Sequence, residues 1–225
     1  MNDIVYFVKD TPENEELRYS LRSLANFPHG KVWFYGGCPD GLKPDKHIYV
    51  KQNLENKWKN VSKMLRMACK NPHISSDFWL FNDDFFIMEK IVHPKNYNNG
   101  DLYKRIVLLE DSHHRITPYS QQLRDMCKEL EAMGCTTLNY TLHIPMLINR
   151  DKALELFNIS ECTMFRSLYG NYCGIKSEVM HDVKIVNTEK EYKSGAYLST
   201  DNVSFQGRVG EQIKATFPNK CKYEV

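Results

Sequence analysis

Two adjacent carboxylates follow a strongly apolar segment in the first half of the chain. The segment Asp77–Phe81 leads directly into Asn82, Asp83 and Asp84, and two phenylalanines come next. Two acids between bulky hydrophobic residues cost desolvation free energy unless a cation or hydrogen-bond donors compensate. Mg²⁺ or Mn²⁺ held between carboxylates and a diphosphate would compensate, since Mg²⁺ typically binds one or two carboxylates plus phosphate oxygens. The sequence therefore predicts Asp83 and Asp84 as metal ligands, with a strand-end turn capped by one of them as the alternative.

A histidine and an arginine in the second half are two further candidates for catalysis. His143 precedes an Ile-Pro pair at the expected end of a strand, and histidine side chains titrate near enough to neutral pH for general acid or base work. Arg166 lies in an aromatic setting, where its guanidinium can contact two phosphate oxygens at once. The respective alternatives are a hydrogen-bonded structural histidine and a surface salt bridge.

The composition is that of an ordinary globular protein. Of 225 residues, 42% are hydrophobic, and 30 Lys and Arg against 28 Asp and Glu give a net charge of +2. This balance does not favour whole-protein binding to nucleic acid or to a membrane surface. The mean hydropathy of −0.53 and the absence of an apolar run near the ~20 residues that a bilayer needs exclude a transmembrane helix. Seven scattered cysteines without a Cys-x-x-Cys pair, and an N-terminus unlike a signal peptide, predict a cytoplasmic protein with reduced thiols.

Short apolar strands alternate with amphipathic helices in the first half of the chain. Strands are predicted at residues 4–8, 32–35, 47–50 and 77–81. Two apolar stripes at helical spacing predict helices between them: Leu17, Leu21 and Leu24, and Trp58, Val61, Leu65 and Cys69. The alternation indicates an α/β fold with a mostly parallel central sheet flanked by helices. In such sheets ligands bind beyond the carboxyl ends of the strands, where Asp83 and Asp84 would lie.

The second half is less regular, and more helical than extended. We expect a turn at 97–100, a helix at 121–133, a strand at 138–144, a helix capped by Asp151, a loop at 169–174 and an amphipathic helical tail at 202–217. Gly207 and Gly210 weaken the helical pattern of the tail. Because no repeat, linker or low-complexity segment interrupts the chain, residues 1–225 are predicted to form a single domain.

Several short motifs, taken together, resemble the Stealth family of sugar-1-phosphate transferases. Residues 14–24 with 82–86 resemble the second signature block of that family, and residues 143–145 with 165–167 resemble the third. Residues 198–202 fall where the fourth block would lie, and residues 5–10 replace the first block. The resemblance spans roughly residues 13–205 in family order and implies a GT-A-like nucleotide-sugar fold of short, divergent type.

The resemblance also implies how the site is composed. It implies that Asp83 or Asp84, His143 and Arg166 belong to one site, with a nucleotide-sugar-binding half at 1–90 and an acceptor and catalytic half at 91–225. Asp84, His143 and Arg166 are the predicted catalytic residues. The candidate donor-binding residues are Lys9, Asp10, Asn60, Lys63, Asp201 and Asn202.

The predicted function is that of a metal-dependent transferase. It would use a nucleotide-diphosphate sugar and move a sugar-1-phosphate or a glycosyl group to an acceptor hydroxyl, on a glycan or, alternatively, on modified nucleic acid. A phage-type glycosyltransferase acting on hydroxylated bases would need a basic face, which the helix with Lys57, Lys59, Lys63, Arg66 and Lys70 would offer unless it is an ordinary solvated surface. A non-catalytic sugar-nucleotide-binding module is the other alternative.

Overall fold

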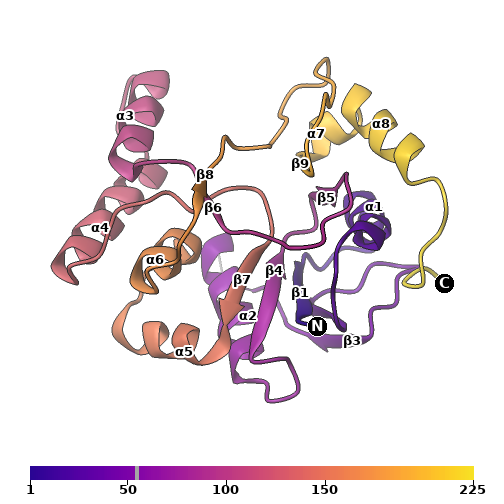
Figure 1. Cartoon of the computed structure of the whole chain (residues 1–225), viewed down its shortest axis with the longest axis horizontal. Coiled ribbons are helices and arrows are strands. Elements are labelled where there is room, and N and C mark those ends of the chain that lie inside the picture. The colour runs from indigo at the N-terminus through magenta and orange to yellow at the C-terminus, as the bar shows by residue number, and fades with distance from the viewer. Residues whose placement is uncertain (54–55) are drawn as a thin grey trace. The chain divides into compact units, whose positions relative to one another are not determined.

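The computed structural model of the chain describes residues 1–53 and 56–225 (Figure 1). These residues divide into two units. The first unit consists of residues 1–94, 143–150 and 183–225, and the second of residues 95–142 and 151–182. Within the described residues, every helix is too short or too polar to cross a membrane.

A five-stranded sheet in the order β3-β2-β1-β4-β7 forms the centre of the first unit. Four of its strands are parallel: β1 (Asp3–Val8), β2 (Val32–Gly36), β3 (Lys46–Tyr49) and β4 (Asp77–Phe81). The edge strand β7 (Met146–Asn149) runs antiparallel to β4. The prediction of a mostly parallel sheet flanked by helices is confirmed. The four predicted parallel strands are present within one residue of their expected bounds. Their carboxyl ends share one side of the sheet, which we call the carboxyl edge.

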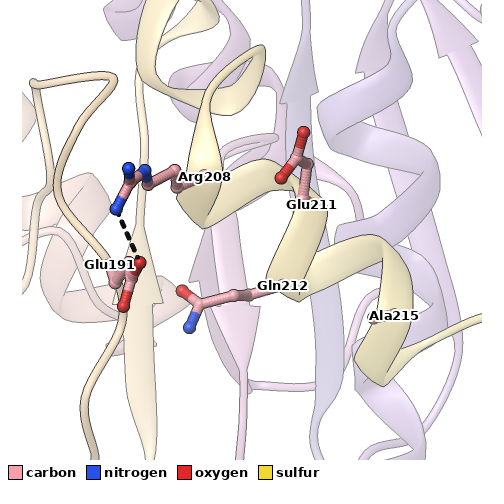
Figure 2. Close-up of a pocket in the computed structure, with 5 residues that line it drawn as sticks. All are labelled: Glu191, Arg208, Glu211, Gln212 and Ala215. Carbon is pink, nitrogen blue, oxygen red and sulfur yellow. Dashed lines mark hydrogen bonds and ion pairs between the residues drawn. The ribbon is translucent and has the colours of Figure 1, made fainter.

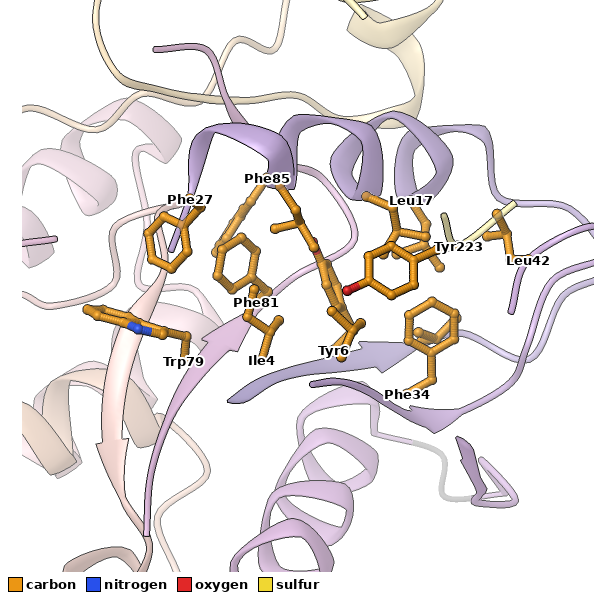
Figure 3. Close-up of a cluster of buried hydrophobic side chains, with 14 of the residues drawn as sticks. Ile4, Tyr6, Leu17, Phe27, Phe34, Leu42, Trp79, Phe81, Phe85 and Tyr223 are labelled. Atoms are coloured by element: carbon orange, nitrogen blue, oxygen red, sulfur yellow. The ribbon is translucent and has the colours of Figure 1, made fainter. Parts of the chain in front are cut away.

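Two helices cover opposite faces of this sheet. Figure 3 shows α1 (Glu15–Ser23) over an aromatic cluster on one face and α2 (Lys57–Lys70) beneath the other. Leu17 and Leu21 of α1 pack on Tyr6 of β1 and on neighbouring aromatic rings. A short 3₁₀ helix, η1 (Leu24–Asn26), continues α1. The buried residues of α2 are Met64, Leu65, Ala68 and Cys69, whereas Val61 of the expected stripe is 39% exposed.

A small antiparallel pair and two short helices complete the first unit. Strand β5 (Phe85–Ile87) pairs with β9 (Tyr197–Ser199), and α7 (Asn202–Phe205) is followed by α8 (Arg208–Thr216). The single helix expected at 202–217 is thus broken. Gly207 lies at the break, where a Cβ atom would come within 2.5 Å of the carbonyl oxygen of Thr188. Close backbone contact, rather than flexibility, therefore explains this glycine.

The segment around Glu224 is bound to α1 through a buried ion pair. The Glu224 side chain is fully buried and accepts hydrogen bonds from Arg22 Nε at 2.7 Å and Arg18 Nη1 at 3.1 Å. The backbone N–H of Cys221 donates to the same carboxylate at 3.0 Å. Although burial alone would raise it, the pKa of Glu224 is lowered to about 2 by these donors, above all by Arg22. Tyr223 beside it belongs to the aromatic cluster under α1 (Figure 3).

The second unit is mainly helical. It holds α3 (Leu102–His113), α4 (Pro118–Ala132), α6 (Phe165–Tyr172) and most of α5 (Arg150–Ile159), with a short parallel pair of β6 (Tyr97–Asn98) and β8 (Glu178–Val179). The turn expected at 97–100 therefore begins as a strand. Helix α3, which the sequence did not predict, packs beside α4 (Figure 1). Helix α5 begins at Arg150, so Asp151 lies in its first turn and is not the predicted cap.

The strand predicted at 138–144 is wrong, because side chains satisfy the backbone there. Asn171 accepts from the N–H of Leu138 and donates to its carbonyl oxygen, both at 2.8 Å. Asn139 Oδ1 accepts from the N–H of Thr141 at 3.0 Å. Among the described residues, the segment forms only an isolated bridge between Leu138 and Asp101. Such side-chain bonds compete directly with a strand ladder.

The loop predicted at 169–174 is also wrong over its first residues, which belong to α6. Gly170 lies within this helix, and a Cβ atom there would come within 2.5 Å of the Tyr140 ring. Asn171 is buried, and its side chain is hydrogen-bonded to the backbone of Leu138. The glycine and asparagine that indicated a loop therefore serve close packing and backbone pairing inside the second unit.

Candidate active site

Asp83 and Asp84, here called the acid pair, lie in the turn between β4 and β5 at the carboxyl edge. Asn14 Nδ2 donates to Asp83 Oδ2 at 2.7 Å, while Asn14 Oδ1 caps α1 by accepting from the N–H of Leu17 at 2.9 Å. Lys184 Nζ forms an ion pair with Asp84 Oδ2 at 2.9 Å. Asp84 Oδ1 is buried and has no hydrogen-bond partner among the described residues. Asp83 is thus engaged by a neutral donor, and Asp84 keeps one unsatisfied oxygen.

A third carboxyl, that of Glu16, belongs to the same cluster. Thr200 Oγ1 donates to Glu16 Oε1 at 2.6 Å. Burial raises the pKa of Glu16 to about 7, and the charges of Asp84 and Asp83 add to the rise. Burial, together with the charge of Asp84, also raises the pKa of Asp83. The cluster therefore holds more acidic groups than its own donors stabilise as anions, so it favours a proton or a cation.

Replacement of Glu16 by glutamine is expected to change how stability depends on pH. Folding raises the pKa of Glu16 from 4.5 to about 7. The protonated carboxyl of Glu16 therefore contributes fully to the stability of the fold below pH 4.5, and this contribution is lost as the pH rises to about 7. Glu16→Gln stays neutral and keeps the acceptor for Thr200. At pH 8 the variant should exceed the wild type in free energy of unfolding by about 2 kcal/mol, with little difference at pH 4.

Urea denaturation at pH 4, 6 and 8 checks this expectation. Glu15→Gln is the matched control, because Glu15 is a neighbouring carboxylate on α1 whose side chain is 46% exposed and pairs with Lys214 at 3.0 Å. A constant difference in unfolding free energy between Glu16→Gln and the wild type across the three pH values would contradict the raised pKa.

The predicted donor-binding residues Lys9 and Asp10 follow β1 at the carboxyl edge. Both are exposed, and Asp10 Oδ2 accepts from the Tyr49 hydroxyl at 2.9 Å. Gly36 and Gly37 end the neighbouring strand β2 against them. A Cβ atom on Gly37 would come within 2.7 Å of Asp10 Cα, and Gly36 has a φ of +113°. The two glycines therefore allow the ends of β1 and β2 to approach closely at this edge.

The predicted residues Asn60 and Lys63 both lie on α2. Asn60 is half-buried in the first turn of the helix. Lys63 Nζ donates to the carbonyl oxygen of Lys51 at 3.2 Å, in the segment that follows β3. The ammonium is therefore held next to the chain that leaves the carboxyl edge.

The predicted residues Asp201 and Asn202 begin α7. Asp201 is the N-cap of that helix, and the backbone N–H of Ser204, which donates to it at 2.8 Å, lowers the pKa of its carboxyl. Asn202 is exposed. Asp201 thus has a structural role as a helix cap, and its predicted contact with the donor stays a prediction.

His143 lies just before β7, in the first unit. Its ring meets the Phe85 ring edge-on, with 6.4 Å between centroids and 85° between planes. Phe85 directly follows the acid pair, and β7 pairs antiparallel with β4, so the start of β7 adjoins the end of β4. The structure therefore brings His143 to the same edge as Asp83 and Asp84.

Arg166 is the second residue of α6, in the second unit. The neighbouring Phe165 stacks between Phe157 and Tyr169, with ring centroids 5.2 and 5.1 Å apart. This stack explains the aromatic setting seen in the sequence. The role of Arg166 beside the acid pair stays a prediction.

The acid pair offers oxygen ligands of the type that Mg²⁺ and Mn²⁺ prefer. Among the described residues, no group of three or more His, Cys, Asp and Glu side chains is arranged to hold a metal ion. The unsatisfied Asp84 Oδ1 nevertheless fits a hard cation, because a buried carboxylate oxygen without a donor is costly. Mg²⁺ commonly uses one or two carboxylates and completes its shell with water and substrate phosphate. The residues present fit such a shared site.

Sequence reasoning missed four residues of this cluster as individual contributors. They are Asn14, Glu16, Lys184 and Thr200. Asn14 had a local signal, since an asparagine before an amphipathic segment is a typical helix cap. Lys184 lies 100 residues after Asp84, and Thr200 lies 184 residues after Glu16, so no local pattern joins either pair.

A separate surface pocket lies along α8 in the first unit. Figure 2 shows the residues that line it: Glu191, Arg208, Glu211, Gln212 and Ala215. Arg208 Nη1 pairs with Glu191 at 3.1 Å, and Gln212 Oε1 accepts from the N–H of Tyr192 at 2.7 Å. The arginine and the glutamine that line this pocket therefore already have partners within the chain.

No protein-family model matches the chain, and no curated protein matches it. It is similar in structure to a galactosyltransferase, LgtC, in complex with donor and acceptor sugar analogues, with a TM-score of 0.48 and 12% identity over 98% of each chain. An active-site mutant of LgtC gives a TM-score of 0.40 and 12% identity over 92% of this chain and 83% of that one. At this level of similarity no activity transfers to the chain, and the Stealth resemblance stays a prediction from the sequence.

Proposed function

We propose that the protein is a metal-dependent transferase that uses a nucleotide-diphosphate sugar. The observation that carries the proposal is the unsatisfied buried oxygen of Asp84, in an acid pair at the carboxyl edge of a parallel sheet. That edge is where open α/β sheets bind their ligands. A carboxylate pair without enough donors needs a cation there, and a diphosphate bound to the same cation brings the substrate to the edge.

Each residue at the edge has a role in this proposal. Asp83 and Asp84 hold Mg²⁺ or Mn²⁺, which supplies neutralisation of the diphosphate charge when it is bound. Lys9 and Asp10 contact the donor from the end of β1. Asn60 and Lys63 are proposed as further donor contacts within a donor half at residues 1–90, and Asp201 and Asn202 as donor contacts from outside that half.

His143 is the proposed acid–base group. It would accept the proton of the acceptor hydroxyl, or donate one to the leaving group, from its position beside Phe85. Arg166 is proposed to stabilise negative charge on the phosphate that departs or is transferred. The acceptor is proposed to be a hydroxyl group of a glycan.

The reaction is either sugar-1-phosphate transfer or glycosyl transfer. The Stealth resemblance favours the first, in which the acceptor attacks phosphorus and nucleoside monophosphate leaves. Attack at the anomeric carbon would instead release nucleoside diphosphate. Chromatography of the nucleotide product therefore separates the two reactions without any knowledge of the acceptor.

The donor is expected to stabilise the protein in a metal-dependent way. A ligand at one hundred times its Kd adds about 2.7 kcal/mol to the free energy of unfolding. A thermal-shift screen of uridine, cytidine and guanosine diphosphate sugars, each with and without Mn²⁺, measures this. At least one donor should raise Tm with Mn²⁺ and much less without it.

Equal Tm values for every sugar nucleotide, with and without Mn²⁺, would refute the proposed function. Slow release of free nucleotide from the stabilising donor distinguishes a transferase from a module that only binds sugar nucleotides. The screen is repeated with Asp84→Asn, whose donor response should be lost.

A further inference from the structure

Lys184 is the cation that the structure places on the acid pair. Its Nζ lies 2.9 Å from Asp84 Oδ2, and the side chains of Lys184 and Asp84 are only 22% and 14% exposed. A partly buried pair is screened less than a surface ion pair, so each partner compensates much of the other's charge.

The charge of Lys184 acts on more than its direct partner. It lowers the pKa of Glu16, of Asp83 and of Asp201, and so opposes the burial that raises the first two. The ammonium therefore lies among four carboxyl groups and compensates part of their charge.

The backbone at Lys184 is fixed, and its side chain is the part that can move. Residue 184 forms a bridge with Ser199 of β9, and the N–H of Ile185 donates to the carbonyl oxygen of Ser199 at 2.8 Å. Strand β9 in turn pairs with β5, which directly follows the acid pair, with Phe85 opposite Ser199. The ammonium stands at the end of a flexible four-carbon stem on this fixed backbone.

A divalent cation at the acid pair would compete with this ammonium. Asp84 Oδ1 is buried and lacks a hydrogen-bond partner among the described residues, whereas Oδ2 of the same carboxylate already binds Lys184. Two cations within a few ångströms of one carboxylate repel each other strongly where water is largely excluded.

We propose that Lys184 is an internal counter-ion of Asp84, which a divalent cation displaces when it binds to the acid pair. The inference rests on the proposed function, since it takes Asp84 as a cation ligand. It adds that the site exchanges one cation for another, so that Lys184 compensates the negative charge of the acid pair when no metal is bound. Cation binding and the position of the Lys184 side chain are therefore coupled.

The first test uses the wild-type protein and reads the displacement directly. Reductive methylation with formaldehyde and borohydride, followed by mass spectrometry, reports how accessible each lysine amine is. Methylation of Lys184 should be slow in the apo protein and should rise about fivefold or more with saturating Mn²⁺, because loss of the ion pair exposes the amine. Lys214, which pairs with Glu15, should react at the same rate in both conditions. An unchanged rate at Lys184 with Mn²⁺ bound overturns the inference.

The second test measures Mn²⁺ affinity, with free Mn²⁺ read by electron paramagnetic resonance and no nucleotide present. Lys184→Met removes the competing charge, so its Kd for Mn²⁺ should fall about tenfold below that of the wild type. Lys184→Arg keeps the charge and should stay near the wild-type Kd. Lys214→Met is the matched control, since it removes a positive charge from the same unit that pairs with Glu15 rather than with the acid pair.

The outcomes separate this inference from the proposed function. One outcome is that Asp84→Asn loses Mn²⁺ binding while Lys184→Met binds Mn²⁺ no more tightly than the wild type. In that case Asp84 is a metal ligand, but Lys184 is not a counter-ion that the metal displaces. If Asp84→Asn binds Mn²⁺ like the wild type, Asp84 is not a metal ligand, and both the proposed metal site and the counter-ion role of Lys184 are wrong. Tighter binding in Lys184→Met and loss of binding in Asp84→Asn support both.

Discussion

Asp84→Asn is expected to lower donor turnover in Mn²⁺ by about 10³-fold, whereas Asp83→Asn should lower it by only about tenfold. The two adjacent acids differ in their contacts. Asp84 holds the unsatisfied oxygen, so its replacement removes an anionic ligand that nothing replaces. Asp83 accepts one hydrogen bond from Asn14, which an asparagine carbonyl at position 83 can still accept.

Measurement of kcat and donor Kd, with circular dichroism melting, checks this expectation. Asp84→Asn also leaves the Lys184 ammonium without its carboxylate, so some loss of stability accompanies it. The double variant Asp84→Asn, Lys184→Met removes that buried charge and should recover stability without recovering turnover. Normal donor binding in Mn²⁺ by both single variants would show that the acid pair is structural.

Glu224→Gln is expected to destabilise the first unit by about 3 kcal/mol at pH 7. The variant leaves Arg22, which is only 10% exposed, facing a neutral group. The depressed pKa of Glu224 also predicts a pH window. Since the pKa falls from 4.5 to about 2 on folding, the ion pair stabilises the protein fully above pH 4.5 and is lost as the pH falls to about 2.

Urea denaturation of the wild type and Glu224→Gln between pH 2 and pH 7 measures the difference. It should shrink steadily below pH 4.5. Glu189→Gln is the control in the same unit, because Glu189 is 77% exposed where it pairs with Arg208 at 3.6 Å, and its replacement should cost less than about 0.5 kcal/mol. Equal losses of unfolding free energy in Glu224→Gln and Glu189→Gln would mean that burial of the Glu224 ion pair contributes nothing to stability.

Much of the first unit could be predicted from the sequence because its signals are local. Buried parallel strands are continuous apolar runs, as in Val32–Gly36 and Asp77–Phe81, and their bounds follow from the glycines and acids beside them. The second unit gave weaker signals. Asn171 and Gly170 indicate a loop by residue type, but both are buried in α6. Asn171 accepts a hydrogen bond from Leu138, which lies 33 positions earlier, and Gly170 lies against the ring of Tyr140.

The candidate site could be predicted only where its members are close in sequence. Asp83 and Asp84 were found because two acids interrupt an aromatic run. Their partners Asn14 and Lys184 come from the N-cap of α1 and from a bridge to β9. Those contacts follow from tertiary pairing, and periodicity carries no information about them.

The division of the chain into segments has a consequence for how the protein folds during synthesis. The second unit consists of residues 95–142 and 151–182, both of which leave the ribosome before the last segment of the first unit. Tyr223 belongs to the same hydrophobic cluster as Ile4, and Glu224 accepts a hydrogen bond from Arg22 across 202 positions of sequence. Loop closure over such distances is slow compared with the formation of local helices. The hydrophobic cluster on one face of the sheet therefore stays incomplete in the nascent chain until Tyr223 has emerged.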